Sequence, residues 1–330
     1  MNKEDIINFF NKRITIVILP TEQCNFRCIY CYEKFENNKM NRKVIDALKN
    51  FLEKRMIDLD SLRVIWFGGE PLLAYDTVLE IMEYINSKTI EGVPKIEGFM
   101  VTNGYLLNLD KAKKLTELHV NEFQITLDGD EDIHNRRRIN IGKRCTFNVI
   151  WNNIKSILNS NIPLKIYLRI HLSSDNIESV KSLLNRIKRE IELPSNLIIS
   201  FARLGKYGSD YDKYLNTMNN NSILKELVNY ANSLGLKIGY PDLKTSLCYA
   251  SLPTSFVIRS NGKLSKCTLL LRDEINTVGE LKEDGSLNLY QDKIRWWSRG
   301  FFSGNSNELI CPAQPSEFFY NLKVFGDLKE

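Results

Sequence analysis

Short apolar runs alternate with longer amphipathic stretches over the first two thirds of the chain. The short runs are rich in β-branched residues and predict strands, whereas the longer ones carry apolar residues at helical spacing. Expected strands occupy residues 14–19, 62–67, 98–101, 123–127, 164–172 and 197–202, and expected helices occupy residues 43–52, 76–86, 109–118, 146–158 and 177–191. This alternation predicts an α/β fold with a parallel sheet and right-handed crossovers.

Most of the expected strands end in glycine or polar residues. They run into a cysteine-rich loop at 22–32, into 68–71, 102–104 and 128–129, and the fifth carries Arg169 near its end. Because functional sites of parallel α/β folds form at the C-terminal ends of strands, we expect these features to meet on one rim. A turn explains any one of the glycines, but not their shared position at strand ends.

The pattern changes after about residue 205. Residues 210–221 are polar and rich in asparagine, which predicts a loop or linker, and a helix is expected at 223–234. Shorter strand-like pieces follow, such as 255–259 with a turn at 260–263. We therefore expect two domains, at residues 1–205 and 206–330, the second small and irregular.

Composition narrows the class of protein. The chain has 330 residues, 43% of them hydrophobic, and a net charge of +5, which is too small to indicate a nucleic-acid partner. It shows no signal-peptide core and no apolar run of about 18 residues, so we expect a cytoplasmic protein with no membrane partner. Its seven cysteines then favour metal binding or catalysis over disulfides.

Three of these cysteines, Cys24, Cys28 and Cys31, form a CxxxCxxC motif directly after the first expected strand. Structural metal sites usually have four protein ligands, so three thiolates leave a position open. A cubane iron–sulfur cluster held this way would keep one iron free for another molecule. The alternative, a zinc site lacking its fourth ligand, is disfavoured because zinc sites favour CxxC pairs.

The CxxxCxxC motif, with Tyr30 before its last cysteine and the GGEP segment at 68–71, resembles the radical S-adenosylmethionine (SAM) superfamily. The resemblance implies an enzyme with a partial (β/α)6 TIM-like barrel. Its [4Fe–4S] cluster, bound by Cys24, Cys28 and Cys31, would bind SAM at the open iron and cleave it to a 5′-deoxyadenosyl radical. The cofactors would carry out the difficult chemistry, and the protein would position the reactants and exclude competing reactions.

The same resemblance assigns residues to SAM binding. Gly68, Gly69 and Glu70 match the GGE motif that meets the SAM amino group, where glycine lets backbone carbonyls approach an ammonium closely. The backbone and ring of Tyr30 are expected near adenine.

Residues from the next strands complete this expected site. Thr102 and Asn103 match polar residues near the ribose and methionine parts of SAM. Asp128 matches a ribose contact or a structural turn. Arg169 matches an arginine that pairs with the methionine carboxylate, with an internal ion pair as the alternative.

Residues 127–138, LDGDEDIHNRRR, are similar to a segment of peptide-modifying radical SAM enzymes, including anaerobic sulfatase-maturing enzymes. His134 and Arg138 are its polar anchors. Either is a candidate for substrate contact, and His134 is a candidate catalytic base. A role in holding the fourth loop is equally compatible with the sequence.

The C-terminal cysteines resemble a twitch or SPASM auxiliary-cluster domain. Cys248, Cys267 and Cys311 match its ligands, and residues 276–281 match the linker between them. Gln314 stands where the family pattern has a cysteine, so a single auxiliary cluster is expected, with Gln314, water or a substrate thiolate at the fourth iron. A zinc site or a degenerate, empty site remains the alternative.

The resemblance implies a peptide maturase that abstracts hydrogen from a ribosomally made peptide and forms a thioether, a carbon–carbon or ether crosslink, or an oxidised residue. Expected partners are the precursor peptide, bound directly or through a separate recognition protein, and a flavodoxin- or ferredoxin-type reductant. Alternatives are a sulfatase-maturing-type oxidase, a dehydrogenase of a small metabolite, and a non-catalytic iron–sulfur or zinc regulator.

Overall fold

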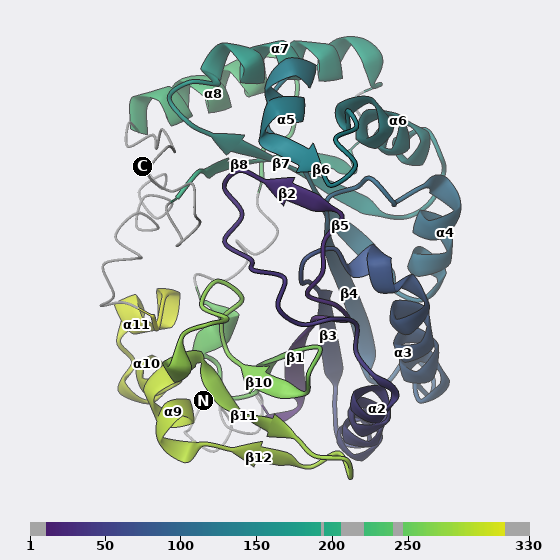
Figure 1. Ribbon diagram of the computed structural model, residues 1–330, viewed down its shortest axis with the longest axis vertical. Helices are drawn as coiled ribbons and strands as arrows, with labels where there is room; N and C mark the ends of the chain where they lie inside the picture. The colour runs from purple at the N-terminus through teal and green to yellow at the C-terminus, as the bar shows by residue number, and fades with distance from the viewer. Residues whose placement is uncertain (1–10, 193–194, 206–220, 240–246, 314–330) are drawn as a thin grey trace.

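The structure is a computed structural model of the chain and describes residues 11–192, 195–205, 221–239 and 247–313. Its main feature is a ten-stranded sheet with the strand order β12-β11-β10-β9-β1-β3-β4-β5-β7-β8. The sheet curves, and the helices lie along its convex side (Figure 1). This arrangement is the partial barrel expected from the sequence.

The expected strands are all present and pair in parallel. They are β1 (Arg13–Ile18), β3 (Ser61–Trp66), β4 (Lys95–Thr102), β5 (Val120–Leu127), β7 (Lys165–Leu172) and β8 (Leu197–Arg203). Among these six strands, neighbours in chain order are also neighbours in the sheet. The glycine and polar residues that follow these strands therefore gather at one end of the sheet.

The expected helices form the outer layer. They are α2 (Arg42–Met56), α3 (Tyr75–Ser87), α4 (Leu109–Glu117), α6 (Phe147–Leu158), α7 (Ile177–Glu190) and α8 (Asn221–Ser233). The side chains of Asn41 and Asn108 accept hydrogen bonds from the first turns of α2 and α4, which fixes where these two helices begin.

Alternate residues of β1 face two apolar layers. Ile16 and Ile18 belong to the large cluster that packs between sheet and helices. Val17 belongs to a smaller cluster on the opposite face, which includes Phe99 and Tyr167. A strand buried on both faces reads as a continuous apolar run, which explains the pattern at residues 14–19.

Before residue 205, two short strands and one short α-helix were not predicted: β2 (Phe26–Cys28), β6 (Arg138–Asn140) and α5 (Glu131–Arg137). β2 and β6 form a separate two-stranded antiparallel sheet that brings Cys28 opposite Arg138. Elements of three residues carry no periodic signal, and α5 lies in a run of charged residues, so neither was visible in the hydrophobic pattern.

The C-terminal strands extend the same sheet. β9 (Ser255–Ile258) pairs in parallel with β1, and β10 (Lys263–Ser265), β11 (Thr277–Leu281) and β12 (Leu287–Leu289) continue the sheet with antiparallel pairing. The short helices α9 (Gln291–Trp297), α10 (Arg299–Ser303) and α11 (Ser306–Ile310) follow. The boundary at 205/206 stays a prediction, since residues 206–220 lie outside the described part. No helix in the described residues is long and apolar enough to cross a membrane.

A buried ion pair joins the two parts of the sheet beyond the strands themselves. Arg259, just after β9, donates from Nε and Nη2 to the two carboxylate oxygens of Glu22, at 3.0 and 2.7 Å. Its Nη1 donates to the carbonyl of Leu271 at 2.8 Å. Both side chains are at least nine-tenths buried. The pair therefore fixes the C-terminal strands against the cysteine loop that contains Glu22.

Replacing Arg259 by methionine should lower the free energy of unfolding by about 3–5 kcal/mol, because Glu22 would keep a buried charge without its partner. Lys54→Met is the matched control, since Lys54 pairs with Asp284 across the same two parts of the chain but on the exposed surface. The Lys54→Met variant should lose less than about 1 kcal/mol of the free energy of unfolding. Urea unfolding measures both, and equal losses would contradict a structural role for the buried pair.

Candidate active site at the carboxyl ends of the strands

The cysteine loop lies at the end of β1 and is shaped by backbone hydrogen bonds. The Phe26 N–H donates to Cys24 Sγ at 3.3 Å, and the Cys31 N–H donates to the Cys28 carbonyl at 3.0 Å. Pairing of β2 with β6 fixes Cys28 from the other side. All three sulfur-bearing side chains are half-buried.

The thiols are close enough to influence one another. Burial, with smaller effects of Cys28 and Cys31, raises the pKa of Cys24, and burial together with Cys28 raises the pKa of Cys31 to about 12. Burial also raises the pKa of Cys28, while Arg138 lowers it. The thiols are therefore protonated near neutral pH, and a bound metal would have to displace their protons.

The donor set suits a cluster better than a single ion. Among residues 11–192, 195–205, 221–239 and 247–313, no three His, Cys, Asp or Glu side chains are placed to hold one metal ion. In a cubane, each cysteine binds a different iron, so its thiolates stand further apart than those around one ion. The three half-buried thiols lie close enough for one to raise the pKa of another, which fits three ligands of one cubane.

The glycines after β3 allow the cysteine loop to lie directly against them. Gly68 has a φ of +114°, and a Cβ built there would lie 2.2 Å from the carbonyl oxygen of Thr21. A Cβ at Gly69 would lie 2.4 Å from the carbonyl oxygen of Gln23. Both positions therefore require glycine for the close approach of two backbones, which leaves their own backbone groups beside the cysteines.

Glu70 joins the ends of β3 and β4. Its carboxylate accepts hydrogen bonds from the Leu72 N–H at 3.0 Å, the Thr102 hydroxyl at 2.8 Å and the Asn103 N–H at 2.7 Å. The carboxylate is fully buried, and burial raises its pKa. Since protein donors occupy it, any contact of this segment with a SAM amino group would come from the backbone around Gly69.

Asn103 connects the end of β4 to the cysteine loop. Its Nδ2 donates to Asn25 Oδ1 at 2.8 Å and lies 4.0 Å from Cys24 Sγ. Its Oδ1 accepts from the Tyr105 N–H at 2.9 Å. The sequence placed Thr102 and Asn103 at this rim; the structure brings Asn103 beside Cys24, whereas Thr102 contacts Glu70.

A polar chain runs across the ends of β5 and β7. Arg169 Nε donates to His171 Nε2 at 3.1 Å, and His171 Nδ1 lies 3.0 Å from Asp128 Oδ1. Burial lowers the pKa of His171, so its ring is neutral near pH 7, with Nδ1–H donating to Asp128. Burial opposes ionisation of Asp128, but His171 and Arg138 outweigh it and hold the pKa of that carboxyl below its usual range.

Tyr30 and Arg138 complete this side of the site. Arg138 Nη1 donates to the Tyr30 hydroxyl at 2.6 Å, and the Tyr30 ring packs edge-on against His171 with 4.8 Å between ring centroids. His171 was not identified from the sequence. The available signal was its spacing from Arg169, because residues two apart on a strand share a face.

His134, a candidate catalytic base from the sequence, lies in the core. Its ring is fully buried, its Nε2 lies 3.1 Å from Thr146 Oγ1, and it packs edge-on against Phe147. Burial lowers its pKa to about 3. Its position in α5, packed against Thr146 and Phe147 at the start of α6, favours the structural role that the sequence also allowed.

The second group of cysteines resembles the first in burial and in the direction of the pKa shifts. Cys248, Cys267 and Cys311 are half-buried, and burial raises the pKa of Cys248 to about 12 and that of Cys267 to about 11, with Cys311 raising both. Gln314 lies outside the described residues. Cys145 is exposed and far from both groups in the sequence.

Two buried residues that the sequence did not single out shape the loop at Cys267. Asn276 Oδ1 accepts the N–H groups of Lys266 and Cys267, and its Nδ2 donates to the Cys267 and Leu270 carbonyls. The Lys266 ammonium is fully buried and donates to the carbonyls of Leu252 and Ser255 at 2.5 and 2.6 Å. These bonds hold the Cys267 loop against the segment that follows Cys248.

Gly68→Ala should lower the free energy of unfolding by about 3 kcal/mol or more, because a methyl group would both strain a positive φ and collide with Thr21. Gly92→Ala is the control: Gly92 also has a positive φ, +78°, but a Cβ added there would meet nothing within 4 Å. It should cost about 1 kcal/mol. Chemical denaturation compares the two, and similar values would contradict the close backbone approach.

Stability should fall in acid partly because of His134. Its pKa is about 3 in the folded chain and about 6.5 when unfolded, so between these values the unfolded chain binds more protons there. This site alone removes up to about 1.4 kcal/mol per pH unit as pH falls through that window. Denaturation of His134→Gln at pH 6.5 to 4.5 should show a shallower slope than the wild type. An unchanged slope in His134→Gln would refute the assignment.

Comparison with known proteins gives three findings. Residues 18–187 match the Radical SAM superfamily. The chain is 30% identical over 168 residues to a GTP 3′,8-cyclase of Clostridium perfringens (strain SM101 / Type A), which covers 50% of this chain and 49% of that protein. It is 23% identical over 311 residues to a cysteine-type anaerobic sulfatase-maturating enzyme of Clostridium novyi (strain NT), covering 86% of this chain and 80% of that protein. The chain thus spans about half the length of the cyclases that it matches.

Solved structures agree in fold. The chain superposes with a TM-score of 0.64 at 18% identity on native anSMEcpe with bound AdoMet and Cp18Cys peptide, covering 88% of this chain and 82% of that one. It superposes with a TM-score of 0.60 at 15% identity on Streptococcus suis SuiB bound to precursor peptide SuiA, covering 91% of this chain and 69% of that one. The chain belongs to the radical SAM superfamily and is an enzyme, and this membership implies a [4Fe–4S] cluster and SAM as its cofactors.

Proposed function

We propose that the chain is a radical SAM peptide maturase, which abstracts hydrogen from a ribosomally made peptide to form a thioether, a carbon–carbon or ether crosslink, or an oxidised residue. The supporting observation is the extent of the similarity to the sulfatase-maturating enzyme. That similarity runs over 311 residues, whereas the similarity to GTP 3′,8-cyclases stops at 168. The longer match takes in most of the region that carries the second group of cysteines.

In this proposal Cys24, Cys28 and Cys31 would hold the cluster, which in its reduced form would supply the electron for SAM cleavage and so the radical that abstracts hydrogen. The protein's own residues would position the reactants and shield the radical from side reactions. The backbone at Gly68 and Gly69 faces the cysteine loop, and Asn103 orients it through Asn25.

The other side of the SAM site would be formed by Tyr30, Asp128 and Arg169. Asp128 has one carboxylate oxygen on His171 and a second, buried oxygen without a hydrogen bond among the described residues. An unpartnered buried carboxylate oxygen is costly, and a ligand hydroxyl would satisfy it. This favours the ribose contact over the purely structural turn.

Cys248, Cys267 and Cys311 are proposed to hold one auxiliary cluster, with Gln314, water or a substrate thiolate as its fourth ligand. A twitch- or SPASM-like domain at 206–330 would contain it. The buried side chain of Lys266, next to Cys267 in the chain, would place a positive charge near ionised thiolates and so favour their metal-bound form.

The partners follow from this chemistry. A precursor peptide would bind directly or through a separate recognition protein, and a flavodoxin- or ferredoxin-type protein would reduce the cluster in an anaerobic cytoplasm. A sulfatase-maturing-type oxidase is the second candidate, favoured by the same 311-residue match. Superfamily membership argues against the non-catalytic regulator considered from the sequence.

The test is turnover by the anaerobically reconstituted enzyme with SAM and dithionite. Candidate substrates are a short peptide encoded beside this gene, a cysteine-containing sulfatase peptide, and GTP. We expect 5′-deoxyadenosine together with a peptide lighter by a pair of hydrogens. Cys24→Ala should abolish SAM cleavage because the cluster cannot form.

The matched control is Cys267→Ala, which should keep SAM cleavage but lose the peptide product. Consumption of GTP with all peptides untouched would contradict the proposal. Oxidation of the sulfatase peptide with no change in the encoded peptide would support the second candidate instead.

A further inference from the structure

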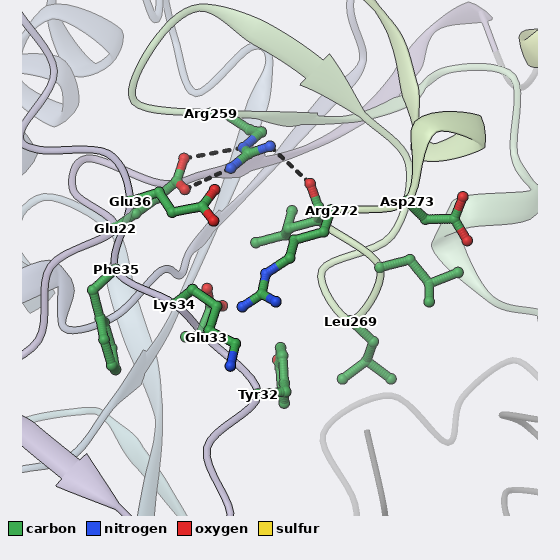
Figure 2. A pocket seen from close by; sticks show the side chains of 12 residues that line it. Glu22, Tyr32, Glu33, Lys34, Phe35, Glu36, Arg259, Leu269, Arg272 and Asp273 are labelled. Atoms are coloured by element: carbon green, nitrogen blue, oxygen red, sulfur yellow. Dashed lines mark hydrogen bonds and ion pairs between the residues drawn. The ribbon is translucent and has the colours of Figure 1, made fainter. Parts of the chain in front are cut away.

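A cavity lies between the segments that follow Cys31 and Cys267 and is not used by the site described above. It has a volume of about 190 Å³. One wall is the segment that follows Cys31, residues 32–36, and the other is the segment that follows Cys267, residues 269–273. Figure 2 shows the side chains of both segments facing the same space. The cavity therefore lies where a substrate close to both thiol groups would pass.

The innermost ion pair of the cavity is already saturated. Glu22 and Arg259 line it, but the carboxylate of Glu22 accepts both Nε and Nη2 of Arg259. The remaining Nη1 of Arg259 donates to the Leu271 carbonyl. These two residues therefore form a rigid, electrically balanced floor and offer no free charge to a ligand.

Glu33 is different. Its Oε1 is buried and forms no hydrogen bond within the described part of the chain. A buried polar atom without a partner costs free energy, and a buried carboxylate oxygen costs more than a neutral one. Burial, together with the charge of Glu22, raises the pKa of this carboxyl to about 8, whereas Arg259 and Arg272 lower it, so its ionised form is disfavoured unless a cation enters. A donor from a bound molecule would relieve this cost.

The other walls suit an aliphatic stem. Tyr32, Phe35 and Leu269 contribute apolar surface to the cavity. Long cationic side chains bury their methylene groups against such surface while the charged end seeks an acceptor, and aromatic faces attract cations as well. Tyr32 and Leu269 come directly after Cys31 and close after Cys267, so a side chain held here would be near both groups.

The size of the cavity restricts the occupant. Drug-sized ligands need pockets of roughly 300–1,000 Å³, and a nucleotide such as GTP belongs in that range. A cavity of about 190 Å³ is smaller and accommodates one side chain. This argument is independent of charge and favours a peptide residue over a nucleotide.

We propose that this cavity is a specificity site that takes one lysine or arginine side chain of the peptide substrate, with the Glu33 carboxylate as its counter-ion. The inference rests on the proposed peptide-maturase function and adds the class of side chain that the enzyme selects.

Arg272 is the exposed competing cation at this site. Apart from the saturated Arg259, the cavity is also lined by Lys34, which is half-buried and has an interaction partner of its own. Arg272 lines the cavity, and within the described residues its guanidinium forms no hydrogen bond or ion pair. Its charge acts on Glu33 from a distance. Arg272 therefore balances part of the charge of Glu33 without closing the cavity, and a substrate cation that enters would gain the direct contact that Arg272 does not make.

The first experiment measures binding without turnover, so it does not depend on the peptide function. Ligand-observed NMR on the reconstituted enzyme with SAM would compare butylammonium, propylguanidinium, butyrate and butanol. We expect the two cations to bind and butyrate and butanol to bind at least about tenfold more weakly, in line with a charge-assisted hydrogen bond to a buried carboxylate. This comparison uses the wild type and needs no variant to fold.

Variants then assign the site. Glu33→Gln should weaken binding of butylammonium about tenfold or more, whereas Glu36→Gln, on the exposed rim of the same cavity, should change it less than about threefold. Arg272→Gln should strengthen it by removing the competing cation. Preference of the wild type for butyrate, with loss of that binding in Arg272→Gln, would overturn the proposal, as would equal affinity in Glu33→Gln.

A second experiment uses a modified peptide once one is in hand. Replacing its lysine or arginine near the modified residue by glutamine should raise KM about tenfold for the wild type and have little further effect in Glu33→Gln. An equal rise in both enzymes would overturn the proposal. If no peptide is modified, but butylammonium binding depends on Glu33, then the maturase function fails while the cation site stands.

Discussion

The bidentate pair between Glu22 and Arg259 is the interaction on which the relation of the two cysteine groups depends. Glu22 lies at the start of the CxxxCxxC loop, and Arg259 lies between Cys248 and Cys267. The sheet alone brings β9 beside β1, but pairing of backbones leaves the loops beyond the strands free to diverge. A buried pair with all its partners satisfied removes that freedom, because each charge can be desolvated only in contact with the other.

The order of parallel strands could be predicted, but the antiparallel extension at the other edge could not. Residues 14–19 and 197–202 are apolar on both faces and alternate with amphipathic helices, which determines a parallel α/β sheet. By contrast β10 and β12 have three residues each. Their position depends on hydrogen bonds to β9 and β11 and not on local pattern, so the sequence indicated only short strand-like pieces.

In the candidate site, too, some residues could be predicted from the sequence and others could not. Cys24, Gly68, Asn103 and Asp128 follow strands, and their residue types indicate what they can do. Glu22, Glu33, Arg259 and His171 could not be selected, because a charged residue in a sequence is normally a solvated one. What distinguishes them is burial together with specific partners, and these depend on segments more than a hundred residues apart, such as Glu22 with Arg259. The sequence did indicate Glu70, but as a contact to SAM. In the structure its carboxylate instead accepts hydrogen bonds from Thr102 and Asn103 at the end of β4.

Each group of cysteines has one buried cation beside it, and this pairing follows from electrostatics. Arg138 lies next to Cys28 and keeps its charge despite burial, because guanidinium does not lose its proton in proteins. Lys266 lies next to Cys267, and burial lowers its pKa to about 7, although Cys248 raises it. Without metal, that lysine is only partly charged beside neutral thiols. Ionised thiolates would stabilise its charge and the charge would stabilise them, so metal binding at the second group and protonation of Lys266 should reinforce each other. At the first group the cation is permanent, and loading requires only that the thiols lose their protons.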